Sequence, residues 1–333
     1  MTNLRIIDVA SLVNRDSDDD SPAVLATAKQ LVSALSEEGF LYIKGHDVPE
    51  SLQSDLETVA RAFFAEPLAT KNSIRMENAG RVWKGYFPVG AELTSGIPDQ
   101  KEGLYFGTEI PDDHPSVTAG NPMHGSNQWA SDQMRDVVLE YTSAMRTLGE
   151  QLMRAVGLGL GLSADYFASR YDDDPTCLFR IFNYPSLAAK KDDDWSVRQH
   201  TDMGFLTILK QDDLGGLEVQ SPDGEWLPAP PVPGTFVINI GDMLELWTWG
   251  KLRATLHRVR NTASVDRLSF PFFFDPGWDK TLERIDRHRL GNLPKRSYAE
   301  DRWDQLDLGQ ISADSTYGEF VWNKVKRVFP HLV

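Results

Sequence analysis

The chain has 333 residues, of which 41% are hydrophobic and 25% charged, and its formal net charge is −15 at pH 7. This length suffices for a large core, and the acidic balance argues against a nucleic-acid or anionic-membrane partner, which would require a basic surface. No apolar run approaches the roughly 18 residues of a membrane span. The first residues lack a signal-peptide core, and the single cysteine, Cys177, excludes an internal disulfide. These features favour a cytoplasmic protein.

The first part of the chain predicts a short strand over 4–9, a helix after Ser21 and a strand over 40–44. Ser21 is a good N-cap residue, Pro22 suits the first helical position, and Gly39 can end the helix. A second amphipathic helix is predicted to begin near residue 49. The acidic runs 16–20 and 192–194 are interpreted as exposed loops, and a second metal site at 192–194 is the less favoured interpretation.

Residues 75–125 scatter aromatic side chains among glycine and proline, which is typical of loops and short strands that could cover a cavity. The longest helix is predicted over 131–156, where apolar residues recur every three or four positions. The glycine-rich stretch 157–161 is expected to end this helix, and a short helix is predicted over 163–171.

Beyond residue 176 the pattern becomes rich in β-branched and aromatic residues. Short runs separated by turn residues cover 177–184, 200–209, 216–219, 235–240, 254–260 and 267–274. This spacing predicts a sandwich or barrel, and eight strands in two sheets would form a jelly roll. Helical patterns return after residue 280 and finish in an amphipathic helix over 315–329. We therefore expect a mixed α+β fold with a helical N-terminal region over 1–172, a jelly-roll core over 173–280 and a C-terminal helical extension over 281–333.

Three residues of the β-rich part have the chemistry of a metal site. In a strand, His200 and Asp202 would point to the same face, because side chains alternate. His257 follows in another strand-like run, and Arg267 and Ser269 come shortly after it. Two histidines and one carboxylate form the ligand set of a non-haem iron(II) site, which leaves coordination positions open.

This pattern resembles the iron(II)/2-oxoglutarate-dependent oxygenases, in the branch that includes isopenicillin N synthase. The resemblance rests on His-x-Asp, a distant histidine and Arg-x-Ser occurring together. Asn183-Tyr184-Pro185 and the blocks 215–219, 237–242 and 256–259 also look like family elements, and residues from roughly 4 to 120 resemble the helical N-terminal region. The resemblance implies a double-stranded β-helix (jelly-roll) core with N-terminal helices and a C-terminal helix packed around it.

The resemblance also implies roles for individual residues. Iron(II), itself the catalytic centre, would be held by His200, Asp202 and His257. The 2-oxoglutarate candidates are Arg267, Ser269, Tyr184 and Asn183, and the substrate-contacting candidates are Phe273, Trp83, Tyr86 and Arg198. An arginine suits the distal carboxylate of 2-oxoglutarate, because its planar fork binds a carboxylate through two hydrogen bonds and lysine cannot.

The implied activity is that of a dioxygenase of secondary metabolism. It would use O₂ and 2-oxoglutarate to hydroxylate or desaturate a C–H bond of a small molecule, with release of succinate and CO₂. One alternative is an isopenicillin N synthase-like oxidase or cyclase that uses O₂ without 2-oxoglutarate. A non-catalytic jelly-roll protein is disfavoured by the intact triad, and a zinc hydrolase would leave Arg267 and Ser269 unexplained. We expect a monomer or weak homo-oligomer with no nucleic-acid or membrane partner.

The strands that carry His257 and Arg267 constrain the connection between them. If the strands that carry His257 and Arg267 are antiparallel neighbours, both side chains face the cavity only when the connection has odd length or contains a bulge. We expect such a connection over 261–265. The same alternation turns Phe273 toward the cavity.

Overall fold

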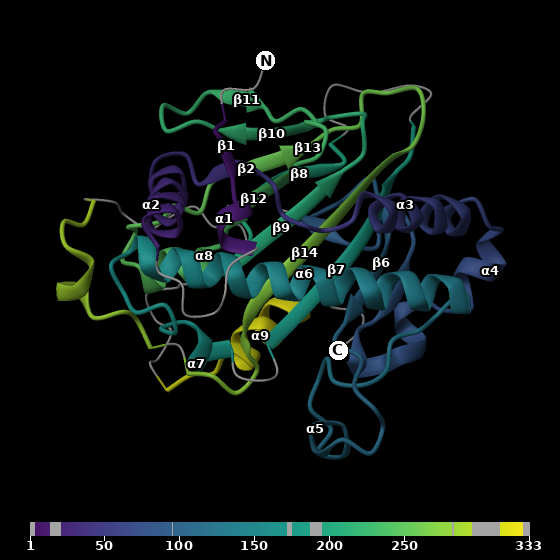
Figure 1. Ribbon diagram of the computed structural model, residues 1–333. Coiled ribbons are helices and arrows are strands. Elements are labelled where there is room, and N and C mark those ends of the chain that lie inside the picture. The colour runs from purple at the N-terminus through teal and green to yellow at the C-terminus, as the bar shows by residue number, and fades with distance from the viewer. Residues whose placement is uncertain are drawn as a thin grey trace.

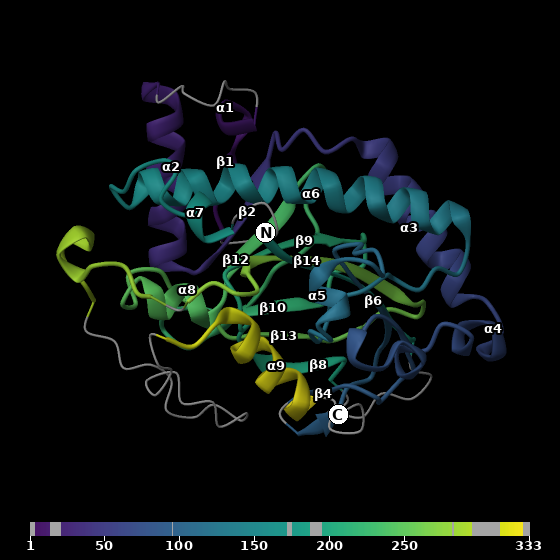
Figure 2. The ribbon, with the colours of Figure 1, turned by 90° about the horizontal axis from the view of Figure 1, so that it is seen from below.

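The protein folds as two facing β-sheets with a layer of helices on the outside of the larger sheet (Figures 1 and 2). The computed structural model describes residues 4–13, 21–94, 96–171, 175–186, 195–281, 283–294 and 314–328. Both acidic runs, 16–20 and 192–194, lie outside these residues. None of the helices in the described ranges is long and apolar enough to cross a membrane.

The larger sheet has eight strands, and all neighbouring pairs are antiparallel except the parallel pair β1 and β2. Its order is β1 (Ile6–Asp8), β2 (Phe40–Lys44), β12 (Phe236–Ile240), β9 (Leu206–Gln211), β14 (Arg267–Gly277), β7 (Pro175–Tyr184), β6 (Glu102–Gly107) and β3 (Gly85–Phe87). Strands from the N-terminal region therefore form both edges of the sheet, so the change of sequence texture near residue 173 does not divide it.

The smaller sheet contains four strands in the order β11 (Trp226–Pro228), β10 (Leu217–Gln220), β13 (His257–Val259) and β8 (Val197–His200). A separate hairpin is formed by β4 (Leu93–Thr94) and β5 (Ile97–Pro98). The two sheets confirm the expected jelly-roll core. Because β13 belongs to the smaller sheet and β14 to the larger, the expected pairing of these two strands is wrong.

Three helices cover the outer face of the larger sheet: α2 (Pro22–Glu37), α3 (Glu50–Phe64) and α6 (Asp132–Gly159) (Figure 2). The side chain of Ser21 accepts a hydrogen bond from the Val24 N–H and caps α2, and Ser131 caps α6 through Met134 in the same way. The glycine-rich stretch does not interrupt α6 where expected, since the helix continues through Gly159.

The shorter helices lie in the connections. They are α1 (Ala10–Val13), α4 (Leu68–Asn72), α5 (Pro115–Thr118), α7 (Ala168–Tyr171), α8 (Asp242–Trp247) and the 3₁₀ helices η1 (Met76–Val82) and η2 (Arg287–Leu290). The helix predicted over 163–171 is therefore restricted to its last turn. The C-terminal α9 (Tyr317–Val328) lies beside the sandwich in Figure 2 and packs against β14.

Side chains of β14 alternate between the face of the larger sheet that packs on the helices and the face directed toward the smaller sheet. Phe270, Phe272 and Phe274 are fully buried, and a Cβ atom placed on Gly149 of α6 would lie 2.7 Å from the Phe274 ring. A side chain at residue 149 would therefore force α6 away from the sheet. The odd-numbered residues of β14, from Arg267 to Asp275, point to the opposite side and line the space between the sheets.

Candidate active site

A cavity of about 150 Å³ lies between the two sheets. Its wall on the larger sheet consists of alternate residues of neighbouring strands. They are Leu178, Arg180, Phe182 and Tyr184 of β7, Arg267, Ser269, Pro271, Phe273 and Asp275 of β14, Thr207 and Leu209 of β9, and Asn239 of β12. One water molecule needs about 10–15 Å³ of cavity volume, so this cavity can hold small molecules.

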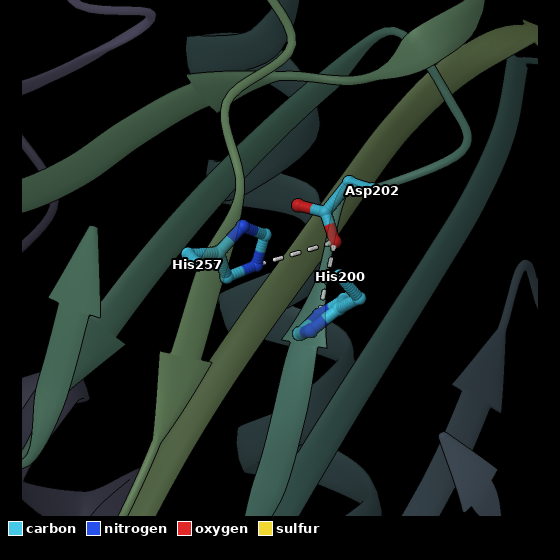
Figure 3. A group of neighbouring side chains, drawn as sticks. All are labelled: His200, Asp202 and His257. Carbon is cyan, nitrogen blue, oxygen red and sulfur yellow. Dashed lines mark ion pairs between the residues drawn. The ribbon is translucent and has the colours of Figure 1, made fainter. Parts of the chain in front are cut away.

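His200, Asp202 and His257 meet on the side of the cavity formed by the smaller sheet. Figure 3 shows both imidazole rings directed toward one carboxylate oxygen, Oδ1 of Asp202. The Nε2 atoms of His200 and His257 lie 3.9 Å and 3.7 Å from that oxygen. Both distances are shorter than twice a metal–ligand bond of about 2.1 Å, so a single ion can contact all three residues.

The local backbone that brings these ligands together differs from the expected single strand over 200–209. His200 is the last residue of β8, whereas Asp202 lies in the loop before β9. His200 pairs with His257 and Val197 with Val259, so three steps on β8 correspond to two on β13. This bulge turns both Val197 and His200 toward the cavity. The expectation of an odd-length connection or a bulge between His257 and Arg267 assumed that β13 pairs with β14; the bulge lies instead between β13 and β8.

Hydrogen bonds fix the orientation of each side chain of the triad. Nδ1 of His200 lies 2.8 Å from the Arg198 carbonyl, and Nδ1 of His257 lies 3.1 Å from the Thr255 carbonyl. Each Nδ1–H therefore donates to the backbone and leaves the Nε2 lone pair for a metal. Oδ2 of Asp202 accepts hydrogen bonds from Thr207 (2.6 Å) and Asn239 (2.7 Å), which leaves Oδ1 directed at the histidines.

The protonation states at the triad suit a divalent metal. Burial, together with the neighbouring His257, lowers the pKa of His200 to about 3, although Asp202 and the Arg198 carbonyl act to raise it, so the His200 imidazole is neutral. Burial acts to raise the pKa of Asp202, but His257, His200 and the hydrogen bonds from Thr207 and Asn239 lower it overall. Neutral imidazole and ionised carboxylate are the forms that bind metals. The donor set therefore fits iron(II).

Arg267 occupies the cavity wall at the start of β14 and is 1% exposed. Its Nε donates to the Gly215 carbonyl, and its Nη2 donates to Oε1 of Gln211 at 3.1 Å. Its Nη1 is buried and has no hydrogen-bond partner within the described residues. Next to it, the hydroxyls of Tyr184 and Ser269 bond each other at 3.0 Å, and the guanidinium lies 5.0 Å from the Tyr184 ring centre. An open cationic donor beside two hydroxyls fits a carboxylate.

Two candidates from the sequence lie on the other face of the larger sheet. Asn183 alternates with Tyr184 and donates to Glu102 (3.0 Å) and Asp266 (3.1 Å). Tyr86 donates to the same Glu102 at 2.6 Å. Neither side chain lines the cavity, because both belong to a buried polar cluster around Glu102. Arg198 does not line it either, and its carbonyl serves instead to orient His200.

Phe273 and Trp83 do line the cavity, together with a group of charged residues that the sequence did not single out. These are Glu92, Lys101, Arg180 and Asp275, with Lys324 from α9. They come from five separate segments, and no local motif marks them. Burial raises the pKa of Asp275 to about 7, against the hydrogen bond from the Phe205 N–H, which lowers it.

Comparison with known proteins agrees with this geometry. Residues 4–132 match the model described as non-haem dioxygenase in morphine synthesis N-terminal, and residues 175–276 match the 2OG-Fe(II) oxygenase superfamily. A Dictyostelium discoideum protein named probable iron/ascorbate oxidoreductase is 42% identical, over 99% of this chain and 95% of its own length. A homoarginine-6-hydroxylase of Glycine max is 38% identical, over 86% of this chain and 90% of its own.

Solved structures give the same assignment. A Neurospora crassa protein crystallised with alpha-KG and thymine superposes with a TM-score of 0.73 at 25% identity, covering 89% of this chain and 92% of its own. The cosubstrate bound in that structure, the triad and the two family matches all point to the same chemistry. The chain belongs to the 2OG-Fe(II) oxygenase superfamily and is an Fe(II)- and 2-oxoglutarate-dependent dioxygenase that oxidises a C–H bond with O₂.

Proposed function

We propose that His200, Asp202 and His257 hold the iron, and that Arg267, Ser269 and Tyr184 bind the distal carboxylate of 2-oxoglutarate. When bound, the iron and 2-oxoglutarate together supply the oxidising chemistry, with succinate and CO₂ as by-products. The observation that carries the assignment of the cosubstrate site is the buried Nη1 of Arg267, which lacks a partner among the described residues. A buried guanidinium nitrogen without an acceptor is costly, and a carboxylate would satisfy it.

The residues around these groups have supporting tasks. Gln211 and the Gly215 carbonyl hold the Arg267 fork in one orientation. Thr207 and Asn239 keep Asp202 ionised and directed at the histidines. Phe40 packs edge-on against His257 at 5.2 Å and shields it from water. Together these contacts preorganise the binding groups before any ligand arrives.

The substrate is a small molecule, since the cavity has a volume of about 150 Å³ and part of its lining is aromatic. We propose Phe273 and Trp83 as substrate contacts, because both line the cavity, and hydroxylation as the reaction, by similarity to the homoarginine-6-hydroxylase. The net charge of −15 supports a protein without a nucleic-acid partner, and the single cysteine supports a cytoplasmic enzyme. We further propose a monomer or weak homo-oligomer.

We also propose that residues 1–172, 173–280 and 281–333 act as three regions of one folding unit. The larger sheet contains strands from the first two regions, and α9 of the third contributes Lys324 and Val325 to the cavity wall. Removal of residues 281–333 should therefore open the cavity and lower substrate affinity more than affinity for 2-oxoglutarate.

The proposed site is tested by anaerobic titration. Addition of iron(II) and 2-oxoglutarate should produce a metal-to-ligand charge-transfer band in the visible, and admission of O₂ should yield succinate slowly even without substrate. His257→Ala should abolish both signals. His46→Ala is the matched control, because His46 is also buried but stacks on Phe236 outside the cavity. Absence of the band in the wild-type protein, or its persistence in His257→Ala, would refute the proposed ligand set.

A further inference from the structure

Arg180 is a second arginine in the cavity wall that has an N–H group without a hydrogen-bond acceptor among the described residues. It projects from β7 on the same face as Tyr184, four residues away along the strand, or about 13 Å. Its guanidinium lies 4.2 Å from the Tyr105 ring centre and 4.9 Å from that of Phe273. Its Nε is buried and has no hydrogen-bond partner among the residues described. The side chain is thus held at its faces by aromatic rings while an N–H donor stays open.

Each acid at this end of the cavity already has a hydrogen bond or an ion pair within the protein. Glu92 accepts a hydrogen bond from the Tyr105 hydroxyl, and it lies 2.8 Å from the Lys101 ammonium. Its distance to Arg180 is longer, 3.6 Å. Lys101 in turn lies 2.5 Å from Asp99, which also accepts from Thr94 at 2.7 Å. Asp275 accepts from the Phe205 N–H at 2.6 Å.

This pattern decides which sign of charge the cavity can accept. Glu92 Oε2 and Asp99 Oδ1 have no hydrogen-bond donor among the described residues, but both carboxylates form ion pairs with the Lys101 ammonium. A cationic ligand group would therefore have to approach Lys101 and share its carboxylates. An anionic group would find the Arg180 Nε without an acceptor. Arginine binds carboxylates through charge-assisted hydrogen bonds, and its planar group is already oriented by the two rings.

We propose that Arg180 is a substrate-binding residue that receives a carboxylate of the substrate, with Phe273 and Trp83 packing against the adjoining carbon skeleton. The substrate class is therefore a small carboxylic acid. This inference rests on the proposed function, because it requires that the iron and 2-oxoglutarate fill the other part of the cavity. Arg180 and Arg267 then divide the two carboxylate ligands between them, one for substrate and one for cosubstrate.

The test uses the wild-type enzyme loaded anaerobically with iron(II) and 2-oxoglutarate, whose charge-transfer band reports binding nearby. The probes are three acids with their primary amides: L-homoarginine, hexanoic acid and phenylacetic acid. We expect at least one acid to shift the band and to bind about 10- to 100-fold more tightly than its amide, the range expected for a charge-assisted hydrogen bond. Arg180→Gln should remove this preference and leave amide affinity and the 2-oxoglutarate titration unchanged.

Two further variants separate recognition from folding. Arg180→Lys should retain part of the preference for acids, since it keeps the charge and loses the fork. Arg284→Gln should retain all of it, because Arg284 also stacks on an aromatic ring, Trp249 at 4.6 Å, but does not line the cavity. If no acid exceeds its amide in the wild type, or if the preference survives in Arg180→Gln, the proposal is wrong. Failure of the proposed function is distinct, because the band would then be missing before any acid is added.

Discussion

Arg267 and Arg180 project into the same cavity from adjacent strands, yet their surroundings differ in one decisive respect. The hydrogen-bond acceptors of Arg267, the Gly215 carbonyl and the Gln211 side chain, are neutral, and Arg267 forms no ion pair within the described part of the chain. Arg180 has a carboxylate, Glu92, at 3.6 Å. The charge of Arg267 is therefore left for a ligand, whereas that of Arg180 is partly compensated before any ligand binds.

This difference matches two kinds of ligand. A cosubstrate shared by every turnover needs one strong, fixed anchor, and an uncompensated buried guanidinium supplies it. A residue that determines specificity must disfavour molecules that lack the matching group. An oriented N–H donor can do this even when it binds weakly, because a molecule without an acceptor leaves the buried donor unpaired. Under the two proposals above, Arg267 would provide affinity for the cosubstrate and Arg180 selectivity for the substrate.

The largest expected effect comes from removal of the uncompensated charge. Arg267→Met should weaken 2-oxoglutarate binding about 1,000-fold, or about 4 kcal/mol, because the carboxylate then enters a buried site without its cation. The affinity of Arg267→Lys for 2-oxoglutarate should lie between that of Arg267→Met and that of the wild type. Iron(II) affinity, measured by titration without 2-oxoglutarate, should not change.

Lys210→Met is the matched control for this variant. Lys210 belongs to the same sheet but faces Glu57 and the Phe270 ring on its outer side. Equal loss of iron and 2-oxoglutarate binding in Arg267→Met would show that Arg267 is structural.

Glu92→Gln tests whether Glu92 partly compensates the charge of Arg180. Glu92 is fully buried; burial acts to raise its pKa, but Lys101 and Arg180 lower it, so it is ionised in the folded protein. Its neutralisation leaves two buried cations with one acid fewer and should cost about 3 kcal/mol of unfolding free energy. Urea unfolding of the iron-free protein measures this loss. Substrate acids should bind the folded variant several-fold more tightly, and weaker binding would contradict the partial compensation of Arg180.

The Arg267 end of the cavity could be predicted from the sequence, and the Arg180 end could not. His200, Asp202, His257, Arg267 and Ser269 occur in short patterns whose chemistry is legible without coordinates. Glu92, Lys101 and Arg180 form one cluster only because β6 pairs with β7 across a large separation in the chain. Non-local strand pairing leaves no spacing rule in the sequence.

Alternation explains both the successes and the errors of the prediction. Phe273 faces the cavity because it lies an even number of residues from Arg267 on one uninterrupted strand. The resemblance of Asn183-Tyr184-Pro185 to a family element implies a cosubstrate role for both Asn183 and Tyr184, but adjacent residues of a strand face opposite sides, and Asn183 bonds Glu102. The connection after His257 was interpreted as a hairpin, whereas the chain passes there from one sheet to the other. Parity arguments hold within a strand and fail across a connection of unknown topology.

Asp275 extends the comparison to the carboxylates of the cavity. The pKa of Asp202 is lowered in the folded state, whereas burial raises that of Asp275 to about 7, above its ordinary value of about 3.9. The folded protein therefore binds a proton at Asp275 that the unfolded chain has released, and the stability tied to this proton is lost as pH rises from about 4 to about 7.

We expect Asp275→Asn to gain about 2 kcal/mol of unfolding free energy relative to the wild type between pH 5 and pH 8. Asparagine keeps an acceptor for the Phe205 N–H and has no charge to bury. Denaturant unfolding of both iron-free proteins at the two pH values measures the difference. A gain that is the same at pH 5 and pH 8 would show that Asp275 does not titrate in this range.

The smallest expected effect concerns the two hydroxyls beside Arg267. The hydroxyls of Tyr184 and Ser269 bond each other at 3.0 Å, and neither forms another hydrogen bond within the described ranges. If they turn toward a carboxylate, Tyr184→Phe and Ser269→Ala should each weaken 2-oxoglutarate binding about 5-fold, near 1 kcal/mol per neutral donor. Each variant should leave the preference of the Arg180 end for acids over amides unchanged. A change in that preference would mean that the two ends of the cavity are coupled, and the assignment of affinity to one arginine and selectivity to the other would no longer hold.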